Sequence, residues 1–276
     1  MKYSYIIAIA AAVAAFTACN KADKYASNSI AFNRVEMTRS YRLAGSAADF
    51  ETERDLTFGC EADILMPTVV YGKAVGAIQD SILSAAFGAS GPDHSAIMTD
   101  AMQRIAGEIG YEVTDTVLPD SVVARTANFV SRYDGFFAVE GCVETLTPRI
   151  LSYAVTTSTY LPHAAHGMYG TRYLNYDLET GKQIELADLF TPEGLAALPA
   201  KLRDTARQME PVIGLTDINS LPADDNFYLA ASGEIVFAYQ PYEVASYAQG
   251  EIQIPIEPYM LVTYLTKDGN RLLLNQ

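Results

Sequence analysis

The chain has 276 residues, of which 50% are hydrophobic and 19% are charged, and its 33 acidic and 19 basic side chains give a formal net charge of −14. Enough apolar residues are present to build a core, which excludes a disordered acidic chain. The excess of acid disfavours nucleic-acid binding, because phosphate contacts need clustered Lys and Arg. The composition therefore indicates an ordered acidic protein of one large domain or two small ones, and it indicates no reaction.

The N-terminal residues depart from this average composition. Lys2 is followed by an uninterrupted run of 11 Ala, Ile, Val and Phe residues at positions 6–16. A run of this length is too short to span a bilayer, which takes about 20 residues, and is typical of a signal peptide. The sequence Phe16-Thr17-Ala18-Cys19 resembles the lipobox of bacterial lipoproteins. The resemblance implies a signal peptide of residues 1–18 and a lipid on the Cys19 sulfur. An ordinary secretory signal with an incidental Cys19 is the alternative.

Cleavage after residue 18 leaves 258 residues, and the loss of Lys2 changes the formal charge to −15. Lipid chains on Cys19 would anchor the protein to a membrane of the cell envelope, facing the periplasm or the cell exterior. The small and polar residues 19–28 are expected to form a flexible tether. No later apolar run reaches 18 residues, so we expect no other segment to span a membrane.

Two further cysteines, Cys60 and Cys142, would lie in an oxidising compartment where a disulfide can form. Cys60 alternates in phase with Ile64 and is expected to point inward. Cys142 is in phase with Glu140 and Glu144 and is expected to point outward. This mismatch favours two free thiols, with a disulfide as the alternative.

An alternation of apolar and polar residues with a period of two predicts most of the structure as strands. The expected strands are residues 29–35, 56–66, 136–146, a strand that includes 151–155, and residues 173–178, 227–231, 235–239 and 252–256. Pro67 is expected to end the second strand. Ser232-Gly233 is a two-residue hairpin signal, because Gly takes positive φ values readily. Pro255 lacks a backbone donor, which places its strand at a sheet edge or ends it there.

Helical spacing predicts four helices between these strands. They are residues 72–87, 97–109, 119–131 and a helix that begins at Pro192, with Thr191 as its N-cap and Glu193 in its first turn. Consecutive strands at hairpin separation favour antiparallel pairing. We therefore predict an α+β fold of antiparallel sheets flanked by helices, with two subdomains in one compact unit.

Motifs for catalysis and metal binding are sparse. His163 and His166 offer two imidazoles, whereas zinc takes three or four protein ligands, and no H-E-x-x-H occurs. The sequence contains neither a G-x-S-x-G elbow nor a G-K-[ST] phosphate loop. Asp224-Asp225-Asn226 lacks the spacing of a calcium-binding EF-hand loop and indicates a solvated turn. We therefore predict no catalytic residue, no metal and no cofactor.

Two segments combine aromatic and polar residues in a way that suits recognition. Residues 162–170 lie between two expected strands, and residues 239–250 follow another. Tyrosine offers a large contact area and a polar tip at a low entropy cost. The candidate ligand-binding residues are His163, His166, Tyr169, Tyr242, Glu243 and Tyr247. The alternative is that these side chains only pack long connections onto a sheet.

The same segments resemble the RsiV-like family, a domain of unknown function numbered 3298. The similar motifs are Ala165-His166-Gly167 and residues 173–182, 184–190 and 227–250, which occur in this order. The resemblance spans roughly residues 165–262. Residues 29–161 resemble, more weakly, the PdaC-type segment that often precedes this domain. The predicted domains are therefore 29–161 and 162–276.

The resemblance implies an α+β envelope domain without established catalytic residues. Some members form the outer part of a lysozyme-sensing anti-sigma factor, and others are attached to peptidoglycan deacetylases. Neither the anti-sigma segment nor the deacetylase motifs occur in this sequence. We therefore expect a lipid-anchored, non-catalytic binding module that recognises a cell-wall component, such as a peptidoglycan fragment, or a cationic wall-acting protein such as lysozyme. The alternatives are a wall-directed hydrolase and a structural envelope lipoprotein.

Overall fold

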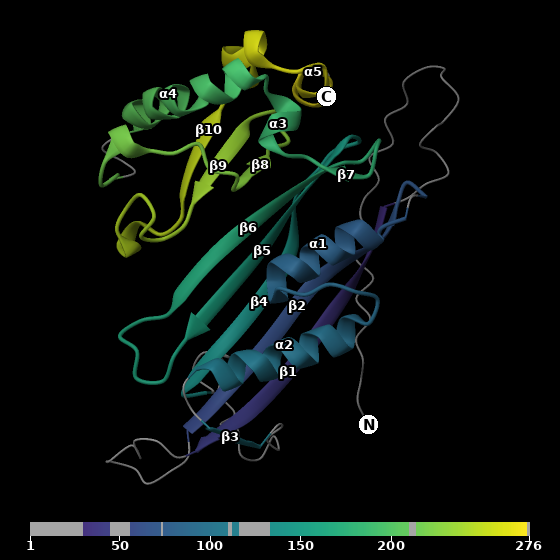
Figure 1. The fold of residues 1–276 in the computed structure, drawn as a ribbon, viewed down its shortest axis with the longest axis vertical. Helices are drawn as coiled ribbons and strands as arrows, with labels where there is room; N and C mark the ends of the chain where they lie inside the picture. Colours follow the sequence, from purple (N-terminus) through teal and green to yellow (C-terminus); the bar gives the residue numbers. More distant parts are fainter. Residues whose placement is uncertain are drawn as a thin grey trace.

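The computed structural model describes residues 30–44, 56–72, 74–109, 112–115, 133–209 and 214–274. Its α+β architecture, with largely antiparallel sheets flanked by helices, confirms the predicted fold class (Figure 1). The predicted signal peptide, Cys19, the tether at 19–28 and the predicted helix at 119–131 lie outside the described residues. Among the described residues, no helix is long and apolar enough to cross a membrane.

A seven-stranded sheet with the order β3-β1-β2-β4-β5-β6-β7 forms the larger part of the fold. Its strands are β1 (Ile30–Ala44), β2 (Leu56–Val70), β3 (Glu112–Asp115), β4 (Gly135–Leu146), β5 (Ile150–Tyr160), β6 (Met168–Asp177) and β7 (Lys182–Gln183). All neighbouring strands are antiparallel except β2 and β4, which are parallel. Hairpin spacing did not predict this pair. It forms because two helices and β3 separate β2 from β4, and parallel strands need such a long crossover.

The strand β2 continues past Pro67, where the sequence predicted its end. Pro67 pairs with Phe32 of β1, and the register of the two strands shifts between Ala31 and Phe32. The parallel pairing of β2 with β4 has already ended at Ile64. At Pro67, β2 pairs only with β1, and the hydrogen bonding between the two strands is irregular there. Such a position tolerates a residue that has no N–H to donate.

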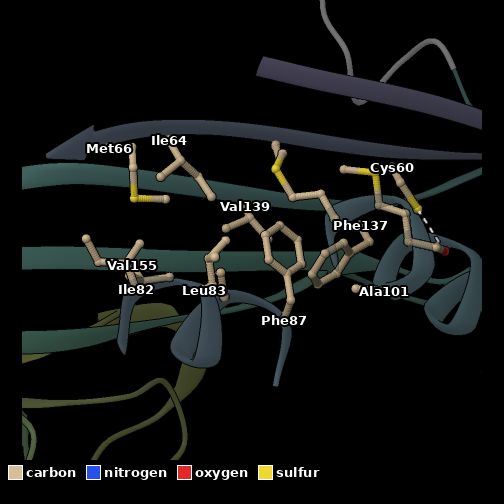
Figure 2. Packing of buried hydrophobic residues seen from close by; sticks show 14 of the residues in the cluster. Cys60, Ile64, Met66, Ile82, Leu83, Phe87, Ala101, Phe137, Val139 and Val155 are labelled. Carbon is tan, nitrogen blue, oxygen red and sulfur yellow. Dashed lines mark hydrogen bonds between the residues drawn. The ribbon is translucent and has the colours of Figure 1, made fainter. Parts of the chain in front are cut away.

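Two helices, α1 (Gly76–Phe87) and α2 (His94–Glu108), cover one face of the large sheet (Figure 1). Asp93 caps α2 by accepting a hydrogen bond from the Ala96 N–H at 3.0 Å. Inward side chains of α1 pack against β4 and β5, where the alternating pattern places apolar residues (Figure 2). The side chains in this contact include Ile82, Leu83, Phe87, Phe137, Val139 and Val155.

A smaller sheet with the order β10-β9-β8 builds the C-terminal part. Its strands are β8 (Phe227–Leu229), β9 (Ile235–Tyr239) and β10 (Ile252–Ile256), and the helices around it are α3 (Leu186–Leu189), α4 (Pro192–Met209) and α5 (Lys267–Leu273). Three predictions are confirmed here. Pro255 lies in the edge strand β10, Gly233 has a φ of 97° in the turn before β9, and Thr191 Oγ accepts a hydrogen bond from the Gly194 N–H at 3.2 Å. The turn between β8 and β9 takes residues 230–234 and is longer than the predicted two-residue hairpin turn.

Buried amides join the small sheet to the large one. Asn175 of β6 donates to the Phe227 carbonyl at 2.7 Å and accepts from the Leu229 N–H at 3.3 Å. Ser152 of β5 donates to the same Asn175 oxygen at 2.6 Å. The domain boundary predicted after residue 161 falls in the loop between β5 and β6, which pair within one sheet, and this division stays a prediction.

Both cysteines of the described residues are free thiols. Cys60 is fully buried in the core, and burial raises the pKa of its thiol to about 12. Cys142 is half-buried, and burial together with Glu140 and Glu144 raises its thiol pKa. We expect iodoacetamide at neutral pH to label Cys142 slowly and Cys60 only after unfolding, since alkylation needs an accessible thiolate. Peptide mass spectrometry of the non-reduced protein checks this, and a peptide linking Cys60 to Cys142 would contradict it.

Candidate functional site

Four of the predicted binding residues meet on the surface and form what we call the aromatic cluster: His166, Tyr169, Tyr242 and Tyr247. The first two lie in the loop before β6 and at the start of that strand, and the last two lie in the loop between β9 and β10. The loop that joins β5 to β6 contacts the loop that joins β9 to β10. Residues about 80 positions apart in the sequence therefore come into contact.

Tyr247 lies at the centre of the aromatic cluster. Its ring stacks on the His166 imidazole with centroids 4.3 Å apart, and the Tyr242 ring lies 5.4 Å away. Tyr169 approaches the same ring edge-on at 6.2 Å. These separations lie in the range in which aromatic pairs attract one another beyond the effect of burial.

Hydrogen bonds fix the orientation of the rings. The Gly167 carbonyl accepts from Tyr247 Oη at 2.7 Å and lies 2.9 Å from His166 Nδ1. Because a carbonyl only accepts, Nδ1 carries the proton, and His166 Nε2 is then the acceptor for the Tyr242 hydroxyl at 3.2 Å. The cluster is therefore held in one arrangement before any ligand arrives, which lowers the entropy cost of binding.

A tight turn presents Tyr242 to solvent. The Glu243 N–H donates to the Gln240 carbonyl at 3.0 Å, and Tyr242 has a φ of 72°. This left-handed conformation is uncommon for a bulky aromatic residue and marks a position that the surroundings hold in place. The Tyr242 side chain is 57% exposed.

The side chain of Gln240 attaches this turn to β6. Its amide accepts from the Thr171 N–H at 2.7 Å and donates to the Thr171 carbonyl at 2.8 Å, in the manner of an added strand. A Cβ at Gly170 would lie 2.7 Å from Gln240 Oε1, so only glycine leaves room for the amide there. The contact also covers backbone groups at a sheet edge, which would otherwise be open to pairing with another chain.

The two other predicted binding residues lie outside the aromatic cluster. His163 is exposed in the same loop, with a φ of 64°. Glu243 points away from the rings: it accepts from the Gln240 N–H at 2.8 Å and lines a hollow on the helix-covered side of β6. Burial and a hydrogen bond with Asp224 raise the pKa of the Glu243 carboxyl, although the Gln240 N–H opposes this.

That hollow belongs to a feature that sequence reasoning missed, which we call the Arg172 groove. It consists of two adjoining hollows of about 690 and about 290 Å³ that share Ala85 and Arg172. The larger runs along α1 and is lined by Asp80, Ser81, Ser84, Ala85, Ser90, Arg172, Leu174 and Gln183. The smaller is lined by Ala85, Val155, Thr157, Gly170, Thr171, Arg172, Asp224, Asn226, Gln240 and Glu243. The one available signal was Arg172 itself, a charged residue in the inward phase of β6, between Gly170 and Leu174.

No group of three or more His, Cys, Asp or Glu side chains within the described ranges is arranged to hold a metal ion. Neither ring nitrogen of His166 contacts a carboxylate among those residues. The aromatic cluster presents fixed rings and polar tips at the surface.

A family model described as "Protein of unknown function (DUF3298)" matches residues 187–258. Residues 187–258 are a DUF3298 domain. The match lies within the span of roughly 165–262 that the sequence motifs predicted, and the chain matches no curated protein. The DUF3298 domain contributes Tyr242 and Tyr247 to the aromatic cluster, whereas His166 and Tyr169 precede it.

Solved structures of DUF3298 proteins resemble the chain over most of its length. A DUF3298 family member from Bacteroides fragilis has 18% identity and a TM-score of 0.64, with 87% of this chain and 95% of that chain covered. A DUF3298 family protein from Pseudomonas aeruginosa has 12% identity and a TM-score of 0.48, with coverages of 86% and 95%. The first likeness shows that the two chains share a fold.

Proposed function

We propose that the protein is a lipid-anchored, non-catalytic binding module of the cell envelope. Its aromatic cluster recognises a cell-wall component, such as a peptidoglycan fragment, or a cationic wall-acting protein such as lysozyme. Cys19 carries the lipid that anchors the module to the membrane. The observation that supports this most strongly is the aromatic cluster, in which exposed rings are fixed by mutual stacking and by hydrogen bonds.

The aromatic cluster offers partner molecules exposed tyrosine rings that are already held in position. Tyr242 is 57% exposed and Tyr169 is 36% exposed, so part of each residue remains open to a sugar or to a protein surface. Pre-positioned tyrosines are frequent among the few residues that dominate binding energy at interfaces. A partner therefore orders few side chains of the module when it binds.

The charge of the chain supports a cationic partner. The formal charge is −14, or −15 once Lys2 is removed with the signal peptide. Opposite net charges speed encounter by long-range steering, and salt weakens this effect. Binding to a cationic protein should thus fall with ionic strength, whereas binding through ring stacking on a neutral glycan should change little.

The test is a pull-down of the purified protein with lysozyme and with insoluble peptidoglycan at low and at physiological ionic strength. We expect the wild type to be retained by at least one of them. Tyr242→Ala removes the most exposed ring of the cluster and should weaken retention by about tenfold or more, since truncation of an interface hot spot costs about 2 kcal/mol.

Tyr259→Ala is the matched control. Tyr259 is 67% exposed and lies in the 3₁₀ segment Pro258–Tyr264, outside the aromatic cluster. We expect this variant to bind like the wild type, and both variants to keep the wild-type melting temperature. Retention of the wild type by neither lysozyme nor peptidoglycan would refute the proposed ligands, and equal binding by both variants would refute the proposed surface.

A further inference from the structure

Arg172 lines both hollows of the Arg172 groove. It forms neither an ion pair nor a hydrogen bond with a side chain anywhere in the described part of the chain. This is unusual for a cation beside acids, because Asp80 lines one hollow and Asp224 and Glu243 line the other. The planar donor fork of Arg172 is thus open to a ligand.

The smaller hollow places opposite charges on its two sides. Arg172 comes from β6, and Asp224 and Glu243 come from segments next to β8 and β9. The Glu243 carboxylate accepts a hydrogen bond from the Gln240 backbone N–H. The Gln240 side chain in turn accepts a hydrogen bond from the N–H of Thr171, the neighbour of Arg172 in the chain. Burial raises the pKa of the Glu243 carboxyl, and its hydrogen bond and charge interaction with Asp224 raise it further. An ammonium group beside the two carboxyl groups would favour their charged forms.

We propose that the Arg172 groove binds a free amino acid or dipeptide in its zwitterionic form. The ligand carboxylate pairs with the Arg172 guanidinium, and the ligand ammonium lies between Asp224 and Glu243. The ligand side chain extends into the larger hollow, toward the hydroxyls of Ser84 and Ser90 and the amide of Gln183. This site goes beyond the proposed function, because none of its residues belongs to the aromatic cluster.

Other small ligands fit the groove less well. A simple anion such as phosphate would face three carboxylates, and a simple cation would face Arg172. The residues that line the two hollows include no aromatic ring on which a neutral sugar would stack. A zwitterion satisfies both charges, and a hollow of about 290 Å³ holds a molecule of its size.

The test is titration of the full chain with three probes, followed by NMR chemical shifts or calorimetry. Alanyl-alanine carries both charges, N-acetyl-alanyl-alanine lacks the ammonium, and alanyl-alanine amide lacks the carboxylate. We expect saturable binding of the first, and affinity about tenfold lower for each of the others, since each loses one charge-assisted contact.

Variants assign the charges to residues. In Arg172→Gln, alanyl-alanine should bind about tenfold more weakly, and amidation of the dipeptide should cause no further loss. In a variant with Asp224→Asn and Glu243→Gln, acetylation should cause no further loss. Arg172→Lys keeps the charge without the fork and should bind with intermediate affinity. Because Arg172 is exposed, we expect these variants to keep the wild-type melting temperature.

Three results would overturn the proposal: no saturable binding of alanyl-alanine, equal binding of the three probes, or wild-type affinity in Arg172→Gln. The same variant should still be retained by lysozyme or peptidoglycan to the wild-type extent. The groove and the aromatic cluster can therefore fail separately, because Tyr242→Ala should leave dipeptide binding unchanged.

Discussion

Asn175→Ala is expected to lower the free energy of unfolding by about 3 kcal/mol. The Asn175 side chain is fully enclosed between the two sheets and is hydrogen-bonded to Ser152 and to the backbone of β8. Its loss leaves the buried Phe227 carbonyl without this donor and opens a void the size of an amide. The Leu229 N–H keeps a partner, because Ser152 Oγ lies 3.1 Å from it, and this limits the loss.

Urea unfolding followed by circular dichroism measures this effect. Asn219→Ala is the matched control, because Asn219 is exposed and its side-chain oxygen accepts only a surface hydrogen bond from Arg207. That variant should lose less than about 0.5 kcal/mol. Relative to the wild type, the Asn175 variant should show a larger increase of amide hydrogen exchange in β8 and β9 than in β2. A loss below about 1 kcal/mol would show that the amide does not hold the small sheet in place.

The period-two pattern located most of the strands because the large sheet has one face against helices, but it missed the short strands β3 and β7. It failed where a charged residue occupies an inward position of a strand. β1 was expected to end at residue 35 and continues to Ala44, since Arg39 occupies an inward position opposite Cys60 and interrupts the apolar phase. The parallel pairing of β2 with β4 depends on a crossover through two helices, and no local signal encodes the partner of a strand across such a distance.

The aromatic cluster was predictable in part. Composition identified both loops, but the contact of His166 with Tyr247 depends on how the small sheet packs on β6. That packing depends on Asn175 and Gln240, whose partners across to the other sheet are backbone groups and so leave no pattern in the sequence. Glu243 stands beside Tyr242 in the chain, yet it faces the other way because the turn reverses between them.

Asp177→Asn is expected to cost about 2–3 kcal/mol at pH 7, because it removes the most buried partner of Arg271 and leaves that cation only its more exposed partners Glu179 and Asp268. The Asp177 side chain is 6% exposed, and its partner Arg271 of α5 is 28% exposed, which moderates the loss. Arg271 donates to Asp177 at 2.6 Å, and this bond ties the C-terminal helix to the end of β6. Asp268 pairs with the same arginine but is 67% exposed, so Asp268→Asn should cost less than about 0.5 kcal/mol.

The same pair predicts a pH dependence with a defined sign. Burial alone would raise the pKa of Asp177, but hydrogen bonds from Arg271, the Glu179 N–H and the Thr180 hydroxyl hold it below its ordinary value. Between the lowered native pKa and the unfolded value of about 3.9, the unfolded chain binds a proton that the native protein does not, so stability rises with pH. The stabilisation is complete above the unfolded value and is lost as the pH falls through the native one.

The difference between wild type and Asp177→Asn isolates this contribution, since all other carboxylates titrate in both proteins. Urea unfolding between pH 2 and pH 7 should show a constant gap of about 2–3 kcal/mol above pH 5 that narrows as the pH falls below about 4. The gap should close once Asp177 is protonated in the native state, because a neutral carboxyl and an amide then face Arg271 alike. A gap that stays constant down to pH 2 would mean that the charge of Asp177 contributes nothing to the attachment of α5, and that only the shape of its side chain matters.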